Sequence, residues 1–404
     1  MAEQHEKALV PQIRFTGFTD PWEQRKLGEL YQKNDERNTD GLGSERTLSV
    51  ASMTFNSTGN GADESSLPNY KRLQLGDIAF EGHANKEFAY GRFVLNDAGN
   101  GIMSPRFTCL RPIVEQEYSF WKYFIHSEKV MRPILVNSTK SGTMMNELVV
   151  EDFLEQEILV PSLPEQHQIG AFFNHLDSLI TLHQRKYDKL CVLKKSMLDK
   201  MFPKGGSLYP EIRFAGFTDP WEQRKLSSTC EQLSRTINPL ETPNEEFTEY
   251  SMPAFDNNET AETVIGNSMN SLRKIVDRPC LLVNKLNVRK KRIWHVPRPE
   301  ANAVCSSEFV PFSSHSSDLS FIKISLLSER ITAYLESCSS GSSNSQKRVT
   351  PEIIMSSEII APSLAEQRRI GAFFDRLDSL ITLHQRKLEL LRNIKKSMLD
   401  KMFV

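Results

Sequence analysis

Residues 161–202 read PSLPEQHQIGAFFNHLDSLITLHQRKYDKLCVLKKSMLDKMF, a long segment in which apolar side chains recur at helical spacing. Residues 362–403 read PSLAEQRRIGAFFDRLDSLITLHQRKLELLRNIKKSMLDKMF and match the first copy at 31 of 42 positions. The offset between the copies is constant at 201 residues. This agreement at one fixed offset indicates a tandem duplication, and an internal repeat of this size decides the architecture.

Both copies predict a helix that packs along a coiled-coil seam. Their apolar residues alternate spacings of four and three, and His183 and His384 occupy equivalent seam positions. We interpret these histidines as seam residues rather than as a metal pair. Ser162 with Glu165 forms a capping-box pattern at the start of the first helix, and Pro203 marks its end. The seam residues that we expect to form the partner framework are Ile169, Phe173, Leu176, Ile180, Leu190, Ile370, Phe374, Leu377, Ile381 and Leu391.

The predicted helices are long enough to act as rods. The first runs from Pro164 to Phe202, which is 39 residues and corresponds to roughly 58 Å of helix. Two such helices in one chain can pair with each other, and an antiparallel pair would hold two globular modules at opposite ends. The alternative is that each helix is buried separately inside its own domain.

A shorter repeated block opens each half of the chain. Residues 11–27 read PQIRFTGFTDPWEQRKL, residues 210–226 read PEIRFAGFTDPWEQRKL, and the two are identical at 15 of 17 positions. In both, the sequence Asp-Pro-Trp-Glu predicts the start of a helix, with Asp as the N-cap and Pro at the first helical position. We expect Trp22 and Trp221 to be core anchors.

The segments between the repeated blocks differ, although residues 28–160 and 227–361 are almost equal in length. The prediction is a mixed α/β protein (α+β) with two globular domains, two long helices that form an antiparallel coiled coil, and a pseudo-twofold tandem repeat. The predicted parts are a first globular domain at 11–160, a central helix at 161–203, a second globular domain at 210–361 and a C-terminal helix at 362–404. One framework with two different surfaces suits a protein that contacts one kind of partner twice and two different targets. Inserts that drifted after duplication are the alternative.

Composition places the chain among ordinary globular proteins. It has 404 residues, 39% of them hydrophobic and 25% charged, with 50 Lys and Arg against 51 Asp and Glu; the length predicts about two to four domains. No apolar run approaches the roughly 18 residues of a membrane span, and the first residues do not resemble a signal peptide. We therefore expect a cytoplasmic protein without membrane contact. Its six cysteines form no CxxC pair, so we interpret them as reduced core thiols.

Catalytic motifs are missing from the sequence. It contains no GxxxxGK[ST], GxGxxG, HExxH or GxSxG motif and no cluster of His and Cys at metal-binding spacing. It also lacks a Pro-Pro-aromatic tetrad of the kind that holds a flipped base for methyl transfer. We therefore expect no catalytic residue, no metal site and no cofactor in this chain, which is more typical of a reader and scaffold than of a catalyst.

The repeated blocks, with their IRFxGFTDPWEQRKL openings and PSLxEQ-initiated helices, resemble the specificity subunits of type I restriction-modification systems. The resemblance covers almost the whole chain. It implies two target-recognition domains that each read one half of a bipartite double-stranded DNA site. It also implies a framework that recruits two methyltransferase subunits, which motor-nuclease subunits then join. These partners would bind S-adenosylmethionine, ATP and Mg, methylate adenine and cleave DNA, while this chain would be non-catalytic.

DNA contacts must come from local basic patches, because the formal net charge is only −1. The second module offers the candidates Lys285, Arg289, Lys290, Lys291, Arg292 and Trp294, with Gln346, Lys347 and Arg348 at the end of the small-residue loop 339–348. The first module offers Lys71, Arg72, Arg92, Arg106 and Lys140, the last in the loop Lys-Ser-Gly-Thr at 140–143. A solvated charged turn is the alternative interpretation of the patch from Lys285 to Arg292.

Two rival functions remain open at this point. The first is a scaffold whose two modules bind two different proteins without DNA. The second is a free-standing nuclease, which the missing motifs disfavour. Sequence-selective DNA binding that depends on salt would separate the DNA reader from the scaffold.

Overall fold

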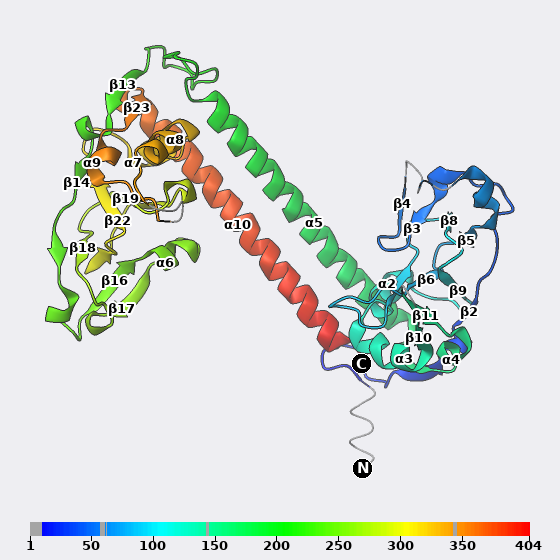
Figure 1. Ribbon diagram of the computed structural model, residues 1–404. Helices are drawn as coiled ribbons and strands as arrows, with labels where there is room; N and C mark the ends of the chain where they lie inside the picture. The colour runs from blue at the N-terminus through cyan, green and yellow to red at the C-terminus, as the bar shows by residue number, and fades with distance from the viewer. Residues whose placement is uncertain (1–9, 57–60, 62, 143–144, 342–345) are drawn as a thin grey trace. The chain divides into compact units, whose positions relative to one another are not determined.

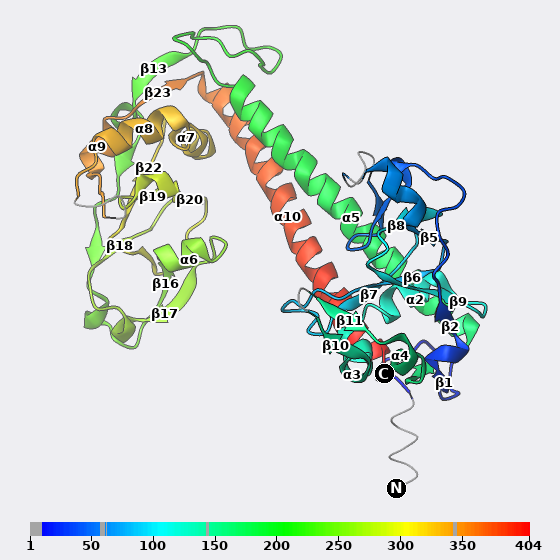
Figure 2. The same ribbon diagram turned by 45° about the vertical axis from the view of Figure 1, so that its right-hand side comes forward.

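The computed structural model describes residues 10–56, 61, 63–142, 145–341 and 346–404. The chain divides into two compact units. Unit 1 consists of Met1–Arg185 and Gln385–Val404, and unit 2 consists of Lys186–His384. Two long helices, α5 (Leu163–Lys200) and α10 (Leu364–Met402), each contribute one part to each unit (Figures 1 and 2). The prediction of two long helices is therefore confirmed.

The two long helices run antiparallel within each unit. In unit 1, Lys395 of α10 forms an ion pair with Asp177 of α5 at 2.6 Å, and the ring of Phe403 lies 5.8 Å from that of Phe173. In unit 2, Lys194 of α5 forms an ion pair with Asp378 of α10. The two ion pairs join residues that are equivalent under the repeat offset of 201. The sequence repeat is therefore also a pseudo-twofold repeat of helix contacts, as the antiparallel coiled coil requires.

Burial differs along the predicted seam, and Leu388 of α10 is also buried. The first three seam positions of each helix are fully buried against the globular part of their unit. The later positions Ile180, Leu190, Ile381 and Leu391 are half-buried, as in a helix pair with no further layer over it. The fully buried positions are Ile169, Phe173 and Leu176 in unit 1 and Ile370, Phe374 and Leu377 in unit 2.

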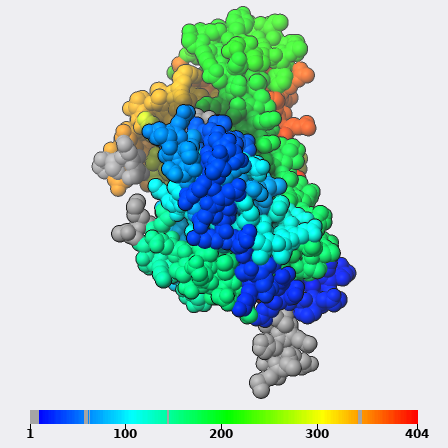
Figure 3. Space-filling model, turned by 90° about the vertical axis from the view of Figure 1, so that its right-hand side faces the viewer, coloured from blue at the N-terminus to red at the C-terminus, as the bar shows by residue number. Residues whose placement is uncertain are grey.

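Unit 1 contains short β-sheets and short helices around one core. A four-stranded antiparallel sheet has the order β2-β9-β6-β7, and β1-β12, β3-β4, β5-β8 and β10-β11 are two-stranded. Figure 3 shows blue, cyan and green segments of this unit next to one another on one face of the molecule. The strands are β1 (Glu23–Lys26), β2 (Tyr31–Lys33), β3 (Leu48–Ser49), β4 (Thr54–Phe55), β5 (Lys71–Leu73), β6 (Ile78–Glu81), β7 (Arg92–Leu95), β8 (Gly101–Met103), β9 (Thr108–Pro112), β10 (Thr139–Ser141), β11 (Asn146–Leu148) and β12 (Glu157–Val160). The helices are η2 (Leu27–Glu29), η3 (Ser44–Arg46), η4 (Glu64–Asn69), α2 (Tyr118–Phe124), α3 (Glu128–Ser138) and α4 (Val150–Leu154).

Unit 2 repeats this plan with a larger second sheet. The sheet β14-β22-β19-β20 corresponds to β2-β9-β6-β7, and a five-stranded sheet has the order β15-β18-β21-β16-β17. Within it, β16 and β21 pair in parallel. The strands are β13 (Glu222–Lys225), β14 (Glu231–Gln232), β15 (Thr236–Ile237), β16 (Glu246–Tyr250), β17 (Glu262–Ile265), β18 (Arg273–Ile275), β19 (Cys280–Asn284), β20 (Ile293–Val296), β21 (Ala303–Cys305), β22 (Phe309–Ser313) and β23 (Glu358–Ala361). The helices are η5 (Leu226–Ser228), η6 (Pro239–Glu241), α6 (Met252–Asp256), η7 (Gly266–Ser268), η8 (Val288–Lys290), α7 (Leu319–Leu326), α8 (Glu329–Ser337) and α9 (Pro351–Met355).

The helix predicted at Asp-Pro-Trp-Glu is wrong in both halves. Glu23–Lys26 forms strand β1, which pairs antiparallel with β12, and Glu222–Lys225 forms β13, which pairs with β23. The reason is tertiary: β12 and β23 directly precede the long helices, and pairing with them overrides a local N-cap preference. The prediction for the tryptophans is confirmed, because Trp22 and Trp221 are both buried in the cores.

The glutamate of the predicted capping box binds an arginine side chain instead of the start of its own helix. Both carboxylate oxygens of Glu165 accept hydrogen bonds from the guanidinium of Arg14, each at 2.7 Å. Glu366 accepts the same pair of bonds from Arg213. The arginine comes from the short repeated block and the glutamate from the long one, so this buried contact explains why the two blocks are repeated together.

Candidate nucleic-acid interface

Unit 2 brings two of the sequence candidates side by side. The loop between β19 and β20 carries Lys285 and residues 287–292. We name this whole loop, residues 285–292, the basic turn. The amide N of Asn287 donates to the carbonyl O of Lys347 at 2.9 Å, and the amide N of Val349 donates to the carbonyl O of Lys285 at 3.1 Å. The small-residue loop therefore lies against the basic turn, although its residues 342–345 lie outside the described part of the chain.

Most cations of the basic turn are already bound to carboxylates. Arg289 forms an ion pair with Glu336 at 2.5 Å, Lys291 pairs with Glu329, and Arg292 binds Asp256 through two nitrogens at 2.8 and 2.5 Å. In the neighbouring loop, Arg348 pairs with Glu308 at 2.9 Å. The hydrogen bond from Lys291 lowers the pKa of Glu329, and that from Arg289 lowers the pKa of Glu336. Much of the positive charge that the sequence shows here is therefore neutralised locally.

Three lysines of these two loops differ from their neighbours. Within the described residues, no carboxylate lies at ion-pair distance from Lys285, Lys290 or Lys347. Lys290 is exposed, and the other two are half-buried. Gln346 is exposed beside Lys347. An anion could therefore bind the three lysines without first breaking an ion pair among the described residues.

Trp294 is a core residue of unit 2. It lies on β20, is buried, and packs edge-on against Tyr250 and Phe255 with ring centroids 4.8 and 5.8 Å away. Both faces of β20 are covered, because the adjacent Ile293 and Trp294 are both buried and belong to two different hydrophobic clusters. The candidate assignment of Trp294 to a DNA surface is therefore replaced by a packing role.

Unit 1 contains the equivalent pair of loops. The β10–β11 hairpin carries exposed Lys140, and the amide N of Asn146 in this hairpin donates to the carbonyl O of Gly82 in the β6–β7 loop at 2.8 Å. A Cβ atom on Gly82 would lie 1.9 Å from the carbonyl O of Asn146, so only glycine allows this approach. Sequence reasoning missed the β6–β7 loop, and Gly82 was the signal that could have found it. Residues 143 and 144 of the predicted loop lie outside the described residues.

The arginine candidates of unit 1 lie in different surroundings. Arg92 on β7 binds Glu81 at 2.8 Å and donates to the carbonyl O of Ala51 at 3.1 Å. Its guanidinium also lies 5.3 Å from the ring centre of Phe88. Arg106 is exposed in the turn before β9. Arg92 is thus fixed in place, while Arg106 is open to solvent.

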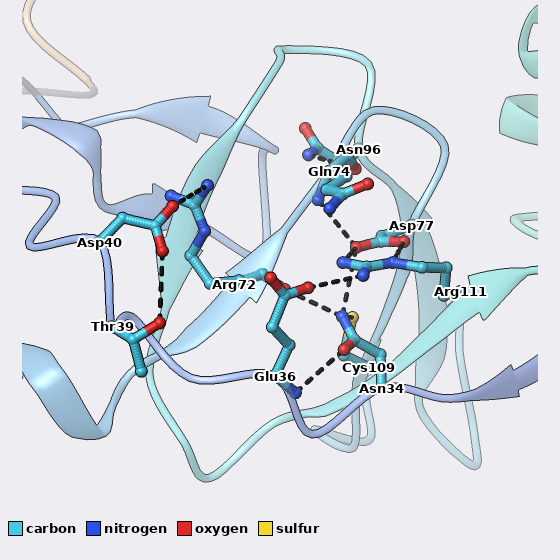
Figure 4. Close-up of polar contacts among 10 residues, drawn as sticks. All are labelled: Asn34, Glu36, Thr39, Asp40, Arg72, Gln74, Asp77, Asn96, Cys109 and Arg111. Atoms are coloured by element: carbon cyan, nitrogen blue, oxygen red, sulfur yellow. Dashed lines mark hydrogen bonds and ion pairs between the residues drawn. The ribbon is translucent and has the colours of Figure 1, made fainter.

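Lys71 and Arg72 are buried on β5. Figure 4 shows Arg72 near a cluster of polar side chains that includes Asp77 and Arg111. Lys71 forms an ion pair with Asp35 at 3.0 Å, and Arg72 pairs with Asp40 at 3.0 Å. Two further nitrogens of Arg72, Nε and Nη1, are buried without a hydrogen-bond partner among the described residues. An unsatisfied buried donor costs about 1–3 kcal/mol. The structure gives both side chains a role inside unit 1.

The polar cluster itself centres on Asp77. Its carboxylate accepts bonds from Arg111 at 3.0 and 2.9 Å and from Asn34 at 3.3 Å. Burial raises the pKa of Asp77, although the bond from Arg111 acts in the opposite direction. Burial also raises the pKa of the neighbouring Cys109 thiol to about 12. This thiol is therefore protonated at neutral pH and is a core group rather than a nucleophile.

The glutamine of the PSLxEQ motif links the globular part of each unit to its long helix. In unit 1, the side-chain O of Gln166 accepts a bond from Trp121 Nε1 at 3.1 Å, and its N donates to Pro161. In unit 2, Gln367 accepts from the amide N of Asp318 at 3.1 Å and donates to Pro362. Both polar residues of the motif therefore make structural contacts. The glutamate binds the short repeated block, and the glutamine binds the globular part of its unit.

The described residues contain neither a metal-binding cluster nor a membrane-spanning helix. No group of three or more His, Cys, Asp or Glu side chains comes together as a metal-binding set within them. Among the same residues, the structure contains no helix with the length and apolar character needed to cross a membrane.

A comparison with models of known protein families gives one match that occurs twice in the chain. The model of the type I restriction modification DNA specificity domain matches residues 19–191 and again residues 219–393. The chain belongs to this family. The two matched segments correspond to the two halves of the sequence repeat, so the resemblance found in the sequence is confirmed.

The chain is also similar to individual relatives and solved structures. The chain is 23% identical over 297 residues to the type I restriction enzyme MjaVIII specificity subunit of Methanocaldococcus jannaschii, covering 69% of this chain and 68% of the relative. Its fold is similar to that of the type I restriction-modification S subunit from M. genitalium, with a TM-score of 0.60 at 14% identity over 98% of this chain and 99% of the other. The HsdS subunit from Thermoanaerobacter tengcongensis matches with a TM-score of 0.46 at 18% identity over 96% and 98% of the two chains. The match to the M. genitalium subunit confirms the predicted fold class.

Proposed function

We propose that the chain is the DNA-reading subunit of a type I restriction-modification complex, in which each recognition domain reads one half of a bipartite site. The observation that carries the proposal is the double family match on one repeated framework. The two halves share the Arg–Glu and Gln contacts of that framework but present different loop pairs. One framework with two different reading surfaces suits an asymmetric DNA site.

The proposal includes partners and boundaries. The recognition domains are residues 11–160 and 210–361, and the helices at 161–203 and 362–404 form the framework for two methyltransferase subunits. Motor-nuclease subunits then complete the assembly. The chain itself supplies no catalytic group, and S-adenosylmethionine, ATP and Mg belong to the partners. Such a complex acts in the cytoplasm, where it meets chromosomal and invading DNA.

The proposed DNA contacts comprise fewer residues than the candidates that the sequence offers. In unit 2 they comprise Lys285, Lys290, Gln346 and Lys347, with Arg289, Lys291, Arg292 and Arg348 available once their carboxylates are displaced. In unit 1 they comprise Arg92, Arg106 and Lys140. Lys71, Arg72 and Trp294 are left out because they are buried.

Replacing Lys290 and Lys347 together with Ala is expected to make DNA binding less dependent on salt. Each lost phosphate contact lowers the slope of log affinity against log salt by about 0.9, so the pair should lower it by roughly 1.8. The measurement is fluorescence anisotropy of the full-length chain with a labelled random-sequence duplex over a range of salt concentrations. The control variant, Lys189→Ala with Lys195→Ala, removes two exposed charges from α5. An equal slope change in both variants would remove the two loops from the interface.

A scaffold without DNA contact is the second candidate function. It predicts that the chain, alone or with its partner subunits, shows no salt-dependent retardation of any duplex in a gel-shift assay. The double family match favours the DNA reader over this alternative.

A further inference from the structure

We propose that Glu329, Glu336 and Asp256 are specificity-determining residues that compete with DNA phosphates for the basic turn. By holding its cations, they suppress binding to DNA outside the target site. The inference rests on the DNA-reading function proposed above and assigns a role to acidic side chains within that surface.

Helix α8 presents its two glutamates to the basic turn. Glu329 and Glu336 are seven residues apart, which places them two turns apart on the same face of the helix. Glu329 binds Lys291, Glu336 binds Arg289, and Lys291 Nζ also donates to the carbonyl O of Leu327 at 3.1 Å. Glu336 also attracts Lys347 of the adjoining loop, which helps to lower the pKa of its carboxyl group. The carboxylates on one face of α8 therefore interact with cations of both loops of the candidate interface.

The basic turn is held in a conformation that its residues adopt rarely. Asn287 and Lys291, which flank η8, both have a φ of 51°, in the left-handed region. A side chain with a Cβ atom is uncommon there and persists only where its surroundings hold it. The ion pairs with α8 and the backbone bond from Asn287 to Lys347 supply such contacts.

Two of the carboxylates are more exposed than the cations that they bind. The side chain of Glu329 is 88% exposed against 31% for Lys291, and that of Asp256 is 55% exposed against 14% for Arg292. The third pair is reversed, with Arg289 at 71% and Glu336 at 24%. An approaching phosphate at the first two pairs therefore meets a negative group before it meets the positive one.

This arrangement weakens nonspecific binding more than target binding. Nonspecific affinity comes almost entirely from phosphate contacts, whereas a target site adds contacts to base edges. A phosphate that takes over Lys291 or Arg289 leaves a carboxylate without its partner beside the DNA backbone, which is unfavourable. Only the additional base contacts of a target offset that loss. The acidic residues therefore raise the ratio of specific to nonspecific affinity, and they help explain how a DNA reader has a net charge of −1.

The test is the double variant Glu329→Gln with Glu336→Gln in the full-length chain. The probe is a labelled random-sequence duplex of about 40 base pairs, roughly four helical turns. Freeing Lys291 and Arg289 is expected to steepen the salt dependence by about 0.9 per cation, roughly 1.8 in total, and to tighten nonspecific binding at low salt. The matched control is Glu211→Gln, which frees Lys200 where α5 ends, from an ion pair of 3.0 Å. This control should leave the slope unchanged.

The glutamate substitutions could also change the conformation of the basic turn. A second pair of variants therefore tests the cations themselves. Arg289→Gln with Lys291→Gln should change the slope by much less than 1.8, because both cations are already neutralised, whereas Lys290→Gln should lower it by about 0.9. Equal slope changes per cation in these two variants would overturn the inference, as would an unchanged or shallower slope in the double glutamate variant. In either case, salt-dependent binding by the unmodified chain keeps the proposed function standing. If the unmodified chain shows no such binding, both proposals fail.

Discussion

Replacing Phe403 with Ala is expected to lower the free energy of unfolding of unit 1 by about 3–5 kcal/mol. Phe403 follows the last turn of α10 and is fully buried. Its ring lies 5.9 Å from Phe120, 5.4 Å from Phe124 and 5.8 Å from Phe173. Truncation would leave a cavity between α2 and the long helix and weaken the attachment of the end of the chain to unit 1.

Hydrogen exchange measured by mass spectrometry can localise this effect. Exchange should accelerate in α2 of unit 1 and remain unchanged in α7 of unit 2. Phe202, the residue equivalent to Phe403, stacks on Phe321 at 5.7 Å, so Phe202→Ala should show the reverse pattern. Leu390→Ala, at a position on α10 that is 59% exposed, serves as the control and should change stability by less than about 0.5 kcal/mol. Equal acceleration in α2 and α7 would contradict the assignment of Phe403 to one core.

Replacing Arg14 with Ala is expected to destabilise unit 1 by about 3–5 kcal/mol, because it leaves the carboxylate of Glu165 buried without its partner. That carboxylate is almost fully buried and receives two bonds of 2.7 Å from Arg14. The readout is the free energy of unfolding in denaturant. The control is Arg25→Ala, which breaks an exposed pair with Glu29 at 3.1 Å and should cost less than about 1 kcal/mol.

A double-mutant cycle separates the ion pair from simple loss of packing. If the penalty comes from the unpaired charge, the double variant Arg14→Ala with Glu165→Gln should be more stable than Arg14→Ala alone. Additive effects of the two single substitutions would show that the two side chains act independently. The equivalent pair, Arg213 with Glu366, should behave in the same way in unit 2.

The long helices and the tandem plan were predictable from the sequence because their signals are local and repeated. Seam residues such as Ile169 and Phe173 recur at helical spacing, and the second copy checks the first. The strand at Glu23–Lys26 was not predictable in this way, because its partner β12 lies more than 130 residues away. The Arg14–Glu165 contact spans 151 residues and overrides a capping pattern that is correct for an isolated helix.

The candidate interface was predictable only in outline. A run of cations in the sequence marks the basic turn, but it gives no information about which of them are neutralised. Glu329, Glu336 and Asp256 come from α8 and α6, and their approach to the basic turn depends on tertiary packing. Trp294 was assigned to the surface by its basic neighbours, whereas both faces of its strand are covered and Trp294 packs in the core. Sequence therefore located the two loops of unit 2 but missed the β6–β7 loop of unit 1, and the fold determines which of their cations are neutralised.

Base-resolved sequencing of adenine methylation in the host genome tests the central claim most directly. The comparison is between the unmodified strain and a strain in which this gene is deleted. The account predicts that one bipartite motif, made of two unlike half-sites with a fixed spacer, is methylated in the first strain and unmethylated in the second. Persistence of every bipartite methylated motif after deletion would contradict the proposal that this chain reads DNA for its partners.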